Sequence, residues 1–268
     1  MKYLSTRDNS LNQSFNDILY QGLSKDGGLY LPREWPTINL DKLLNLSYQE
    51  VATEIIHSFT KDDISKEDLS MIIMNSYVDF KNDKIAPILK LDNNKFLLEL
   101  FYGPTYAFKD YALQFLGNLF SYSLKINPRK ISILGATSGD TGSAAINAFK
   151  SNKDINVFML HPHNKVSPMQ QKQMTTVDEK NIFNIAIEGN FDDCQKIVKK
   201  LFLDDEIQSQ TSLTAVNSIN WARLIAQVVY YFWTYLQIRS KNLNFIVPSG
   251  NFGNIFSAYV AKQMGLPI

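Results

Sequence analysis

From about residue 96 onward, short apolar runs alternate with turns and with stretches that have the period of a helix. The apolar runs are 96–101, 130–134, 156–160, 182–187 and 244–247, and the predicted helices are 108–122, 143–150, 192–203, 220–238 and 254–264. Strands that alternate with helices pair in parallel through right-handed crossover connections. The chain is therefore predicted to be an α/β protein with parallel sheets flanked by helices.

The residues before this alternation, 1–95, have a different and mostly helical pattern. Apolar side chains recur at helical spacing within 48–59, and 68–80 shows a second helical pattern. The polar turn at 92–95 separates two apolar runs, which predicts a hairpin. We therefore expect residues 1–95 to form a mostly helical N-terminal extension with a small hairpin, ahead of an α/β region at 96–268.

Charge and composition exclude several classes of function. The 268-residue chain has a net charge of +1 and no basic run, so it lacks the electrostatic footprint of a nucleic-acid-binding protein. Cys194 is the only cysteine and is expected to pack in the core, and three histidines make a metal site a poor expectation. The N-terminus lacks the apolar segment of a signal peptide, and the longest uncharged stretch, 224–238, is shorter than the ~18–20 residues of a membrane span. We expect a cytoplasmic protein that binds no metal, membrane or nucleic acid.

Two glycine-containing segments follow predicted strands and precede predicted helices. In 249–254, two glycines let backbone N–H groups converge at the start of a helix, a geometry that binds phosphate. In 135–142, hydroxyl side chains and glycines converge in the same way, which predicts a site for a carboxylate or a phosphate. Simpler interpretations stay open, because the first segment also fits a plain strand-to-helix turn and Asp140 also fits a helix N-cap.

Lys109 is the most unusual charged residue of the chain, because it falls just inside a predicted helix beside Phe108 and Tyr111. Most lysines are solvated surface residues. The dipole at a helix N-terminus disfavours a cation, however, and desolvation by aromatic neighbours lowers the pKa of an amine. Lys109 is therefore a candidate nucleophile that forms a Schiff base with a carbonyl group.

A further polar cluster, 217–223, opens the long apolar helix predicted at 220–238. It fits an anion clamp in which Arg223 supplies the charge, and it fits equally well a helix capped by Ser218 and followed by a surface arginine. Two anion-binding segments, one unusual lysine and few metal ligands together suggest a phosphorylated carbonyl cofactor. Pyridoxal phosphate fits that description.

Four ordered motifs resemble those of the threonine synthase family. The segment 99–110 is similar to the segment that carries the family's cofactor lysine. The other similar segments are 136–142, 217–223 and 248–254, together with 5–7, 21–23 and 26–32 near the start of the chain. The resemblance extends over the full 268 residues. Within the family, the chain resembles the long microbial and fungal branch.

The resemblance implies pyridoxal-phosphate fold type II, the fold of the tryptophan synthase β subunit, with a smaller α/β subdomain at about 110–215 inserted in an incomplete large domain. It implies that Lys109 bonds covalently to the cofactor. The cofactor phosphate would be bound by the backbone of Gly250, Asn251, Phe252, Gly253 and Asn254. The substrate carboxylate and the ring hydroxyl of the cofactor would face Ser138, Asp140 and Thr141. The substrate phosphate would be bound by Asn217, Ser218, Asn220 and Arg223.

The reaction implied by the resemblance converts O-phospho-L-homoserine and water to L-threonine and phosphate, the last step of threonine biosynthesis, in a monomer or homodimer. A threonine-synthase-like phospholyase, which releases phosphate and a 2-keto acid, shares the early steps and the motifs. Family members continue well beyond the position that corresponds to Ile268. A C-terminally truncated, non-catalytic fragment is therefore a third interpretation.

Overall fold

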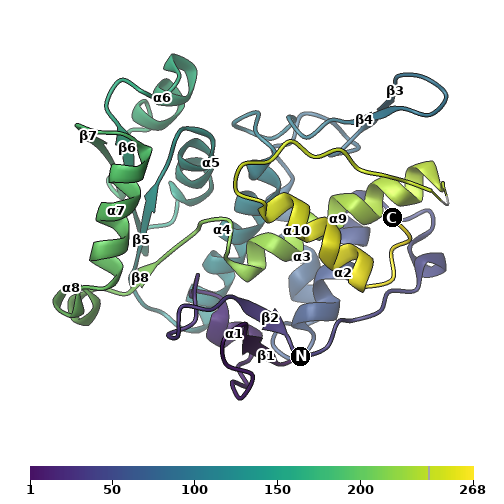
Figure 1. Ribbon diagram of the computed structural model, residues 1–268, viewed down its shortest axis with the longest axis horizontal. Helices are drawn as coiled ribbons and strands as arrows, with labels where there is room; N and C mark the ends of the chain where they lie inside the picture. Colours follow the sequence, from purple (N-terminus) through teal and green to yellow (C-terminus); the bar gives the residue numbers. More distant parts are fainter. Residues whose placement is uncertain (241) are drawn as a thin grey trace. The chain divides into compact units, whose positions relative to one another are not determined.

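The computed structural model describes residues 1–240 and 242–268, which form two compact units (Figure 1). The first unit consists of Met1–Gly103 and Ser218–Ile268, and the second consists of Pro104–Asn217. The segment expected as an N-terminal extension, residues 1–95, thus belongs to the same compact unit as the last part of the chain.

A four-stranded parallel sheet forms the centre of the second unit. Its strands are β5 (Ile131–Ala136), β6 (Ile155–Pro162), β7 (Ile182–Ile187) and β8 (Leu213–Thr214), in the order β7-β6-β5-β8. The first three confirm strands predicted from apolar runs, whereas β8 is too short to show a period in the sequence. Because β6 and β8 flank β5 on opposite sides, the strand order reverses at β5, and α/β sheets bind ligands at such a point.

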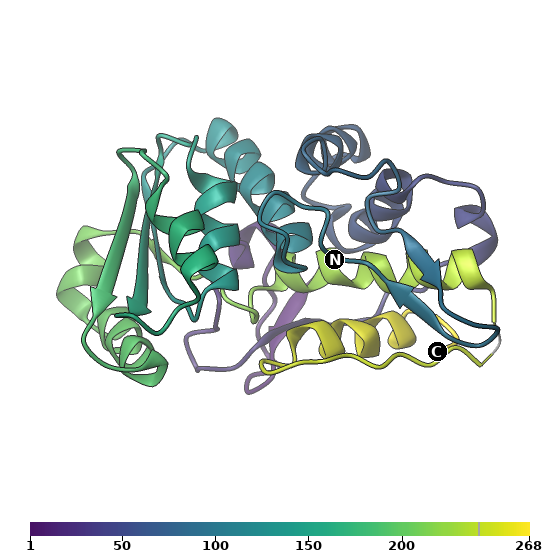
Figure 2. The same ribbon diagram turned by 90° about the horizontal axis from the view of Figure 1, so that it is seen from above.

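Helices cover both faces of this sheet (Figures 1 and 2). The helices of this unit are α4 (Lys109–Ile126), α5 (Asp140–Phe149), α6 (Pro168–Thr175), α7 (Phe191–Phe202) and α8 (Asp205–Gln210), and of these α5 and α7 contact the sheet directly. On one face α7 packs against β5 and β6, where Leu134, Leu160 and Cys194 are buried together. On the other face α5 packs against α4. The position of Cys194 confirms that it packs in the core.

Helix α9 (Trp221–Ile238) is the centre of the first unit and is buried along most of its length. Helices α2 (Tyr48–Thr60) and α10 (Gly253–Gln263) pack against α9, and α3 (Lys66–Ser76) packs against α2. The ring of Trp221 lies 5.6 Å from that of Phe59 between centroids, so the two ends of the chain share one core. None of the described helices combines the length and the hydropathy that crossing a membrane requires.

Two small antiparallel sheets complete the first unit. β1 (Tyr3–Ser5) pairs with β2 (Tyr30–Pro32), and β3 (Ile88–Lys90) pairs with β4 (Phe96–Leu98). The second pair confirms the predicted hairpin, so the apolar run at 96–101 contributes to a hairpin and not to the parallel sheet. Two short helices also belong to this unit, α1 (Phe15–Ile18) and the 3-10 helix η1 (Leu40–Leu43).

The strand predicted at 244–247 is wrong, because this segment pairs with no strand among the described residues. Burial nevertheless alternates along it. Phe245 packs edge-on against Tyr231 with ring centroids 4.8 Å apart, whereas Ile246 is 98% exposed. A two-residue period indicates which side chains face a core, but a strand also needs a neighbour for its backbone hydrogen bonds.

Candidate active site

The turn between β5 and α5, residues 136–142, is built around one buried hydroxyl group. Thr137 is 1% exposed, and its Oγ1 accepts hydrogen bonds from the N–H groups of Gly139 and Gly142 at 2.9 and 2.8 Å. Gly139 has a φ of +141°, and a Cβ at this position would overlap Oε1 of Gln170. The β5–α5 turn therefore requires glycine at position 139, and Thr137 fixes its backbone.

The β5–α5 turn presents backbone donors to an incoming group. Within the described residues, the N–H groups of Ser138, Asp140 and Thr141 donate to no acceptor. They lie at the N-terminus of α5, where the helix dipole favours an anion. The N-cap of α5 is Gly139, so the simpler interpretation of Asp140 as the cap is wrong. The carboxylate of Asp140 instead contacts the side chains of Gln170 and Lys109.

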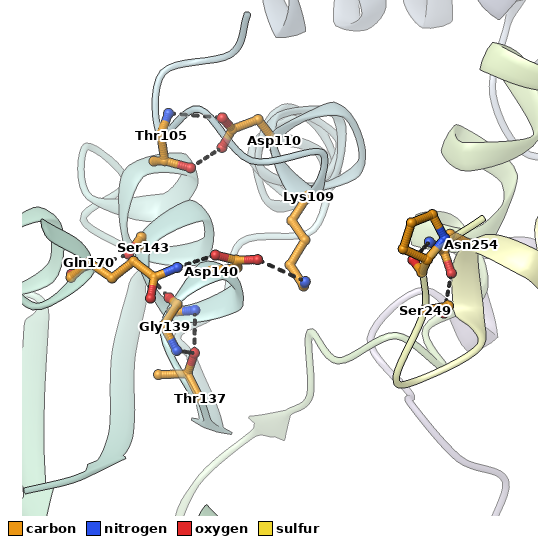
Figure 3. A network of polar contacts seen from close by, with 12 residues as sticks. Thr105, Lys109, Asp110, Thr137, Gly139, Asp140, Ser143, Gln170, Ser249 and Asn254 are labelled. Carbon is orange, nitrogen blue, oxygen red and sulfur yellow. Dashed lines mark hydrogen bonds and ion pairs between the residues drawn. The ribbon is translucent and has the colours of Figure 1, made fainter. Parts of the chain in front are cut away.

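Lys109 is the first residue of α4, as the sequence predicts, and no side chain caps this helix. Its side chain is 17% exposed, and its Nζ lies 4.4 Å from the centroid of the Phe108 ring. The same Nζ lies 3.6 Å from Oδ2 of Asp140 (Figure 3). Both neighbours attract an ammonium group, the ring through its π face and the carboxylate through its charge. The amine is thus held beside the β5–α5 turn.

Asp110, the next residue, is fully buried and fixes the segment before Lys109. Its Oδ2 accepts a hydrogen bond from the N–H of Thr105 at 2.8 Å, and its Oδ1 accepts one from the Thr105 hydroxyl at 2.6 Å. Burial raises the pKa of the Asp110 carboxyl, the hydrogen bonds from Thr105 oppose this rise, and the charge of Asp140 adds to it. No role for Asp110 follows from the motif alone, although Asp110 directly follows the candidate lysine in the sequence.

The turn before α10, residues 249–254, is organised by two polar side chains. Oγ of Ser249 accepts a hydrogen bond from the N–H of Phe252 at 3.0 Å and donates to Oδ1 of Asn254 at 2.5 Å (Figure 3). Phe252 is the N-cap of α10 and has a φ of +57°. The backbone oxygen of Asn254 accepts from the hydroxyl of Tyr231 at 2.7 Å, which joins this α10 turn to α9.

The α10 turn also presents backbone donors. Within the part of the chain that the structure describes, the N–H groups of Gly250, Asn251, Gly253 and Asn254 donate to no acceptor. A Cβ at Gly250 would meet nothing within 4 Å, whereas one at Gly253 would lie 3.1 Å from Cβ of Ser218. Open backbone donors at the start of an 11-residue helix fit a phosphate group.

The polar cluster before α9 has a structural use. Asn220 is the N-cap of α9, and its Oδ1 accepts from the N–H groups of Ala222 and Arg223 at 3.0 and 3.4 Å. Its Nδ2 donates to the backbone oxygen of Leu19 at 3.0 Å, so both ends of this buried side chain are engaged. The interpretation of Ser218 as the cap is therefore wrong.

Arg223 lies inside the first unit and is 1% exposed, and burial lowers the pKa of its guanidinium to about 10. The structure thus divides the predicted site residues between the two units. The second unit holds Lys109, Ser138, Asp140, Thr141 and Asn217. The first unit holds Ser218, Asn220, Arg223, Gly250, Asn251, Phe252, Gly253 and Asn254. The ligand-binding role of each of these residues stays a prediction.

Comparison with known proteins gives a consistent result. A family model described as the threonine synthase N terminus matches residues 2–77. The threonine synthase of Pseudomonas aeruginosa is 47% identical over 100% of this chain, and that of Saccharomyces cerevisiae is 45% identical over 99% of it. A protein named threonine synthase-like 2 from Xenopus laevis is 34% identical over the whole chain.

Solved structures agree with these matches. The pyridoxal-phosphate-bound threonine synthase of Brucella melitensis superposes with a TM-score of 0.93 and 47% identity, and the Escherichia coli enzyme with 0.88 and 35%. Both matches cover 100% of this chain, which confirms the predicted fold type II. The chain spans 58% of the length of the Pseudomonas relative and 59% of the Brucella structure. By sequence and by structure, the chain belongs to the threonine synthase family.

Proposed function

We propose that this chain provides the catalytic lysine of a threonine synthase, which converts O-phospho-L-homoserine and water to L-threonine and phosphate. The observation that carries the proposal is the setting of Lys109. Its side chain is 17% exposed and starts from the first residue of α4, and its amine is held beside a turn with three open backbone donors. An amine that is mostly withdrawn from solvent and placed next to a specific charged partner is a candidate for a functional group.

The residues present fit pyridoxal phosphate as the cofactor. Lys109 offers an amine for the cofactor aldehyde, and the open donors of the α10 turn suit a phosphate group. When bound, the cofactor supplies an electron sink that stabilises negative charge formed at the substrate Cα. The rest of the chemistry belongs to side chains and backbone groups of the protein.

Each group of residues has one task in this proposal. The backbone donors of Ser138, Asp140 and Thr141 bind the substrate carboxylate and so orient the Cα–H bond. The amine of Lys109 removes the proton at Cα and moves protons at Cβ, at an effective concentration that no dissolved amine reaches. The substrate phosphate is bound by Asn217, Ser218 and Arg223, while Asn220, whose side chain is engaged at both ends, holds the start of α9 instead of the phosphate. Charge on that phosphate increases as it leaves, and a guanidinium group stabilises it.

The test is borohydride reduction of the full 268-residue chain after incubation with pyridoxal phosphate, followed by peptide mass spectrometry. We expect an absorbance band near the edge of the visible range that reduction removes, with the label on Lys109. Lys109→Ala should lose the band and the label, whereas Lys125→Ala, at the other end of α4, should keep both. A label on another lysine, or none on a folded chain, would contradict the proposal.

A second candidate reaction is phosphate elimination without hydration, because its early steps are the same as those of the synthase reaction. Product analysis distinguishes the two reactions. Threonine with inorganic phosphate supports the synthase, whereas 2-oxobutyrate with inorganic phosphate and no threonine supports the phospholyase. Binding of the cofactor without turnover of O-phospho-L-homoserine identifies this chain as a non-catalytic fragment.

We also propose that the protein acts in the cytoplasm as a monomer or homodimer. The absence of any described helix suited to crossing a membrane supports the first part. Light scattering of the purified chain tests the second part, and a mass above that of a dimer would contradict it.

A further inference from the structure

Helix α6 contacts both segments that form the site of the second unit. It is only eight residues long, Pro168–Thr175, and its sequence is too polar to show a clear helical period. Two glutamines lie one turn apart on it. Gln170 contacts the β5–α5 turn, and Gln173 contacts the segment before Lys109.

The side-chain amide of Gln170 is fixed at both of its ends. Its Oε1 accepts a hydrogen bond from Oγ of Ser167 at 3.0 Å, and its Nε2 donates to Oδ1 of Asp140 (Figure 3). The absence of a Cβ at Gly139 makes room for this amide, because a methyl group there would overlap Oε1 of Gln170. The glycine and the glutamine are therefore matched to each other.

When one oxygen of a carboxylate is held by a hydrogen bond, the direction in which the other oxygen points is fixed as well. Oδ1 of Asp140 accepts from Gln170, and Oδ2 of Asp140 lies 3.6 Å from Nζ of Lys109. A continuous chain of polar contacts thus runs from Ser167 through Gln170 and Asp140 to the amine of Lys109. Without Gln170 the Asp140 side chain, which is 44% exposed, would be able to turn toward solvent.

Gln173 contacts the segment that precedes Lys109. Its Nε2 donates to the backbone oxygen of Thr105 at 3.1 Å, and the N–H and hydroxyl of Thr105 are bound by Asp110. Among the described residues, these contacts join three charged groups, because Lys109 lies against Asp140 and the carboxyls of Asp110 and Asp140 interact through their charges. From α6, the contacts to Asp140 and to Thr105 come from two uncharged amides.

We propose that Gln170 is a positioning residue that holds the carboxylate of Asp140 against the amine of Lys109, while Gln173 fixes the segment before Lys109 from the same helix. The proposal depends on the proposed function only in treating Lys109 as the functional amine. The contacts themselves require no cofactor. Removing either Gln170 or Asp140 should therefore make the amine lose its proton more easily.

The test measures the pH profile of Lys109 labelling in the full chain without cofactor. Reductive methylation with formaldehyde is followed by peptide mass spectrometry across a pH series. For Asp140→Asn we expect the pH at which half of Lys109 is labelled, the midpoint of the profile, to fall by about 0.5 to 1 pH unit, because an opposite charge near the amine is lost. Gln170→Met should shift the midpoint in the same direction by a smaller amount. In the Asp140→Asn background it should have no further effect.

Gln171→Met is the matched control, because Gln171 is the same residue type on the same helix and its side chain has no hydrogen bond within the described chain. Its midpoint should equal that of the parent. An unchanged midpoint for Gln170→Met, or an equal shift in the presence and absence of Asp140, would overturn the proposal.

If circular dichroism shows that Gln170→Met does not fold, a variant of an exposed residue provides the same test. Ser167→Ala removes the hydroxyl that orients Gln170, and it should shift the midpoint downward by less than Asp140→Asn does. No shift overturns the proposal. The outcome is independent of the cofactor, so a chain that binds no pyridoxal phosphate but shows these shifts contradicts only the proposed function.

Discussion

The two turns with open backbone donors, the β5–α5 turn and the α10 turn, differ in how firmly the rest of the molecule supports them. The β5–α5 turn follows a six-residue strand inside a parallel sheet, and the buried Thr137 and the side chain of Gln170 hold it. The α10 turn follows a segment that pairs with no described strand. Its contacts between Ser249, Phe252 and Asn254 are local, and one long-range hydrogen bond, from the hydroxyl of Tyr231 to the backbone oxygen of Asn254, joins it to α9. Similar backbone donors are therefore held by long-range packing in one unit and mainly by neighbours in sequence in the other.

A glycine-rich turn in the sequence thus predicts backbone donors but not the rigidity of the turn that carries them. Rigidity depends on what anchors the preceding strand and on which side chains fill the space around the turn. If both turns bind anions as proposed, we expect the α10 turn to gain more order from a bound phosphate than the β5–α5 turn gains from its ligand. Paired substitutions, one in each region, test the comparison.

The largest difference is expected in the segments before the two turns. Ile133 of β5 is fully buried, so Ile133→Ala should lower the free energy of unfolding of the second unit by about 3 kcal/mol. Ile246 is 98% exposed, and Ile246→Ala should change stability by less than about 0.5 kcal/mol. Urea denaturation followed by far-ultraviolet circular dichroism measures both effects.

Tryptophan fluorescence localises these changes, because Trp35, Trp221 and Trp233 all belong to the first unit. An equal loss of stability in Ile133→Ala and Ile246→Ala would show that 244–247 is anchored after all. The comparison between the two turns would then fail.

The next effect is expected at the glycines of the turns. Gly139→Ala should cost about 2–3 kcal/mol, because the new methyl group overlaps Gln170 and the φ of +141° strains an alanine. Gly250→Ala should cost less than about 0.5 kcal/mol, because its methyl group would meet nothing within 4 Å. Urea denaturation measures both variants. A costly Gly250→Ala would show that the α10 turn is as tightly enclosed as the other turn.

The smallest effect is expected at the hydroxyl groups that organise each turn. Thr137→Val keeps the shape of the side chain but leaves two buried N–H groups without an acceptor, which should cost about 1–2 kcal/mol. Ser249→Ala removes an acceptor from an exposed N–H group that water replaces, so it should cost about 0.5 kcal/mol. Hydrogen exchange of the peptides that contain each turn measures these local changes. Faster exchange at 249–254 than at 136–142 in the parent chain supports the comparison, and the reverse order contradicts it.

Sequence reasoning predicts most of the α/β architecture, because buried strands and amphipathic helices have clear periods. β5, β6 and β7 appear where the apolar runs predict them, and Lys109 appears at the start of α4. The failure at 244–247 has a physical cause, since the period of a strand is visible within one segment whereas its pairing partner is not.

The residues that support the site could not be predicted from the sequence, for a related reason. Gln170 is separated from Asp140 by 30 positions, and Gln173 from Thr105 by 68. A polar residue on a short polar helix carries no local signal for such contacts. Thr137 and Asp110 lie inside motifs that the sequence identifies, but their tasks follow only from their burial.

The discontinuous first unit has a consequence for synthesis on the ribosome. Residues 104–217 are translated between the two segments that form this unit, at a rate of about 5–20 residues per second, so roughly ten seconds separate them. The second unit is complete in sequence before α9 emerges. During that interval the apolar face of α2 is without α9, which covers it in the finished fold. We expect this face to be the point at which the nascent chain recruits a chaperone.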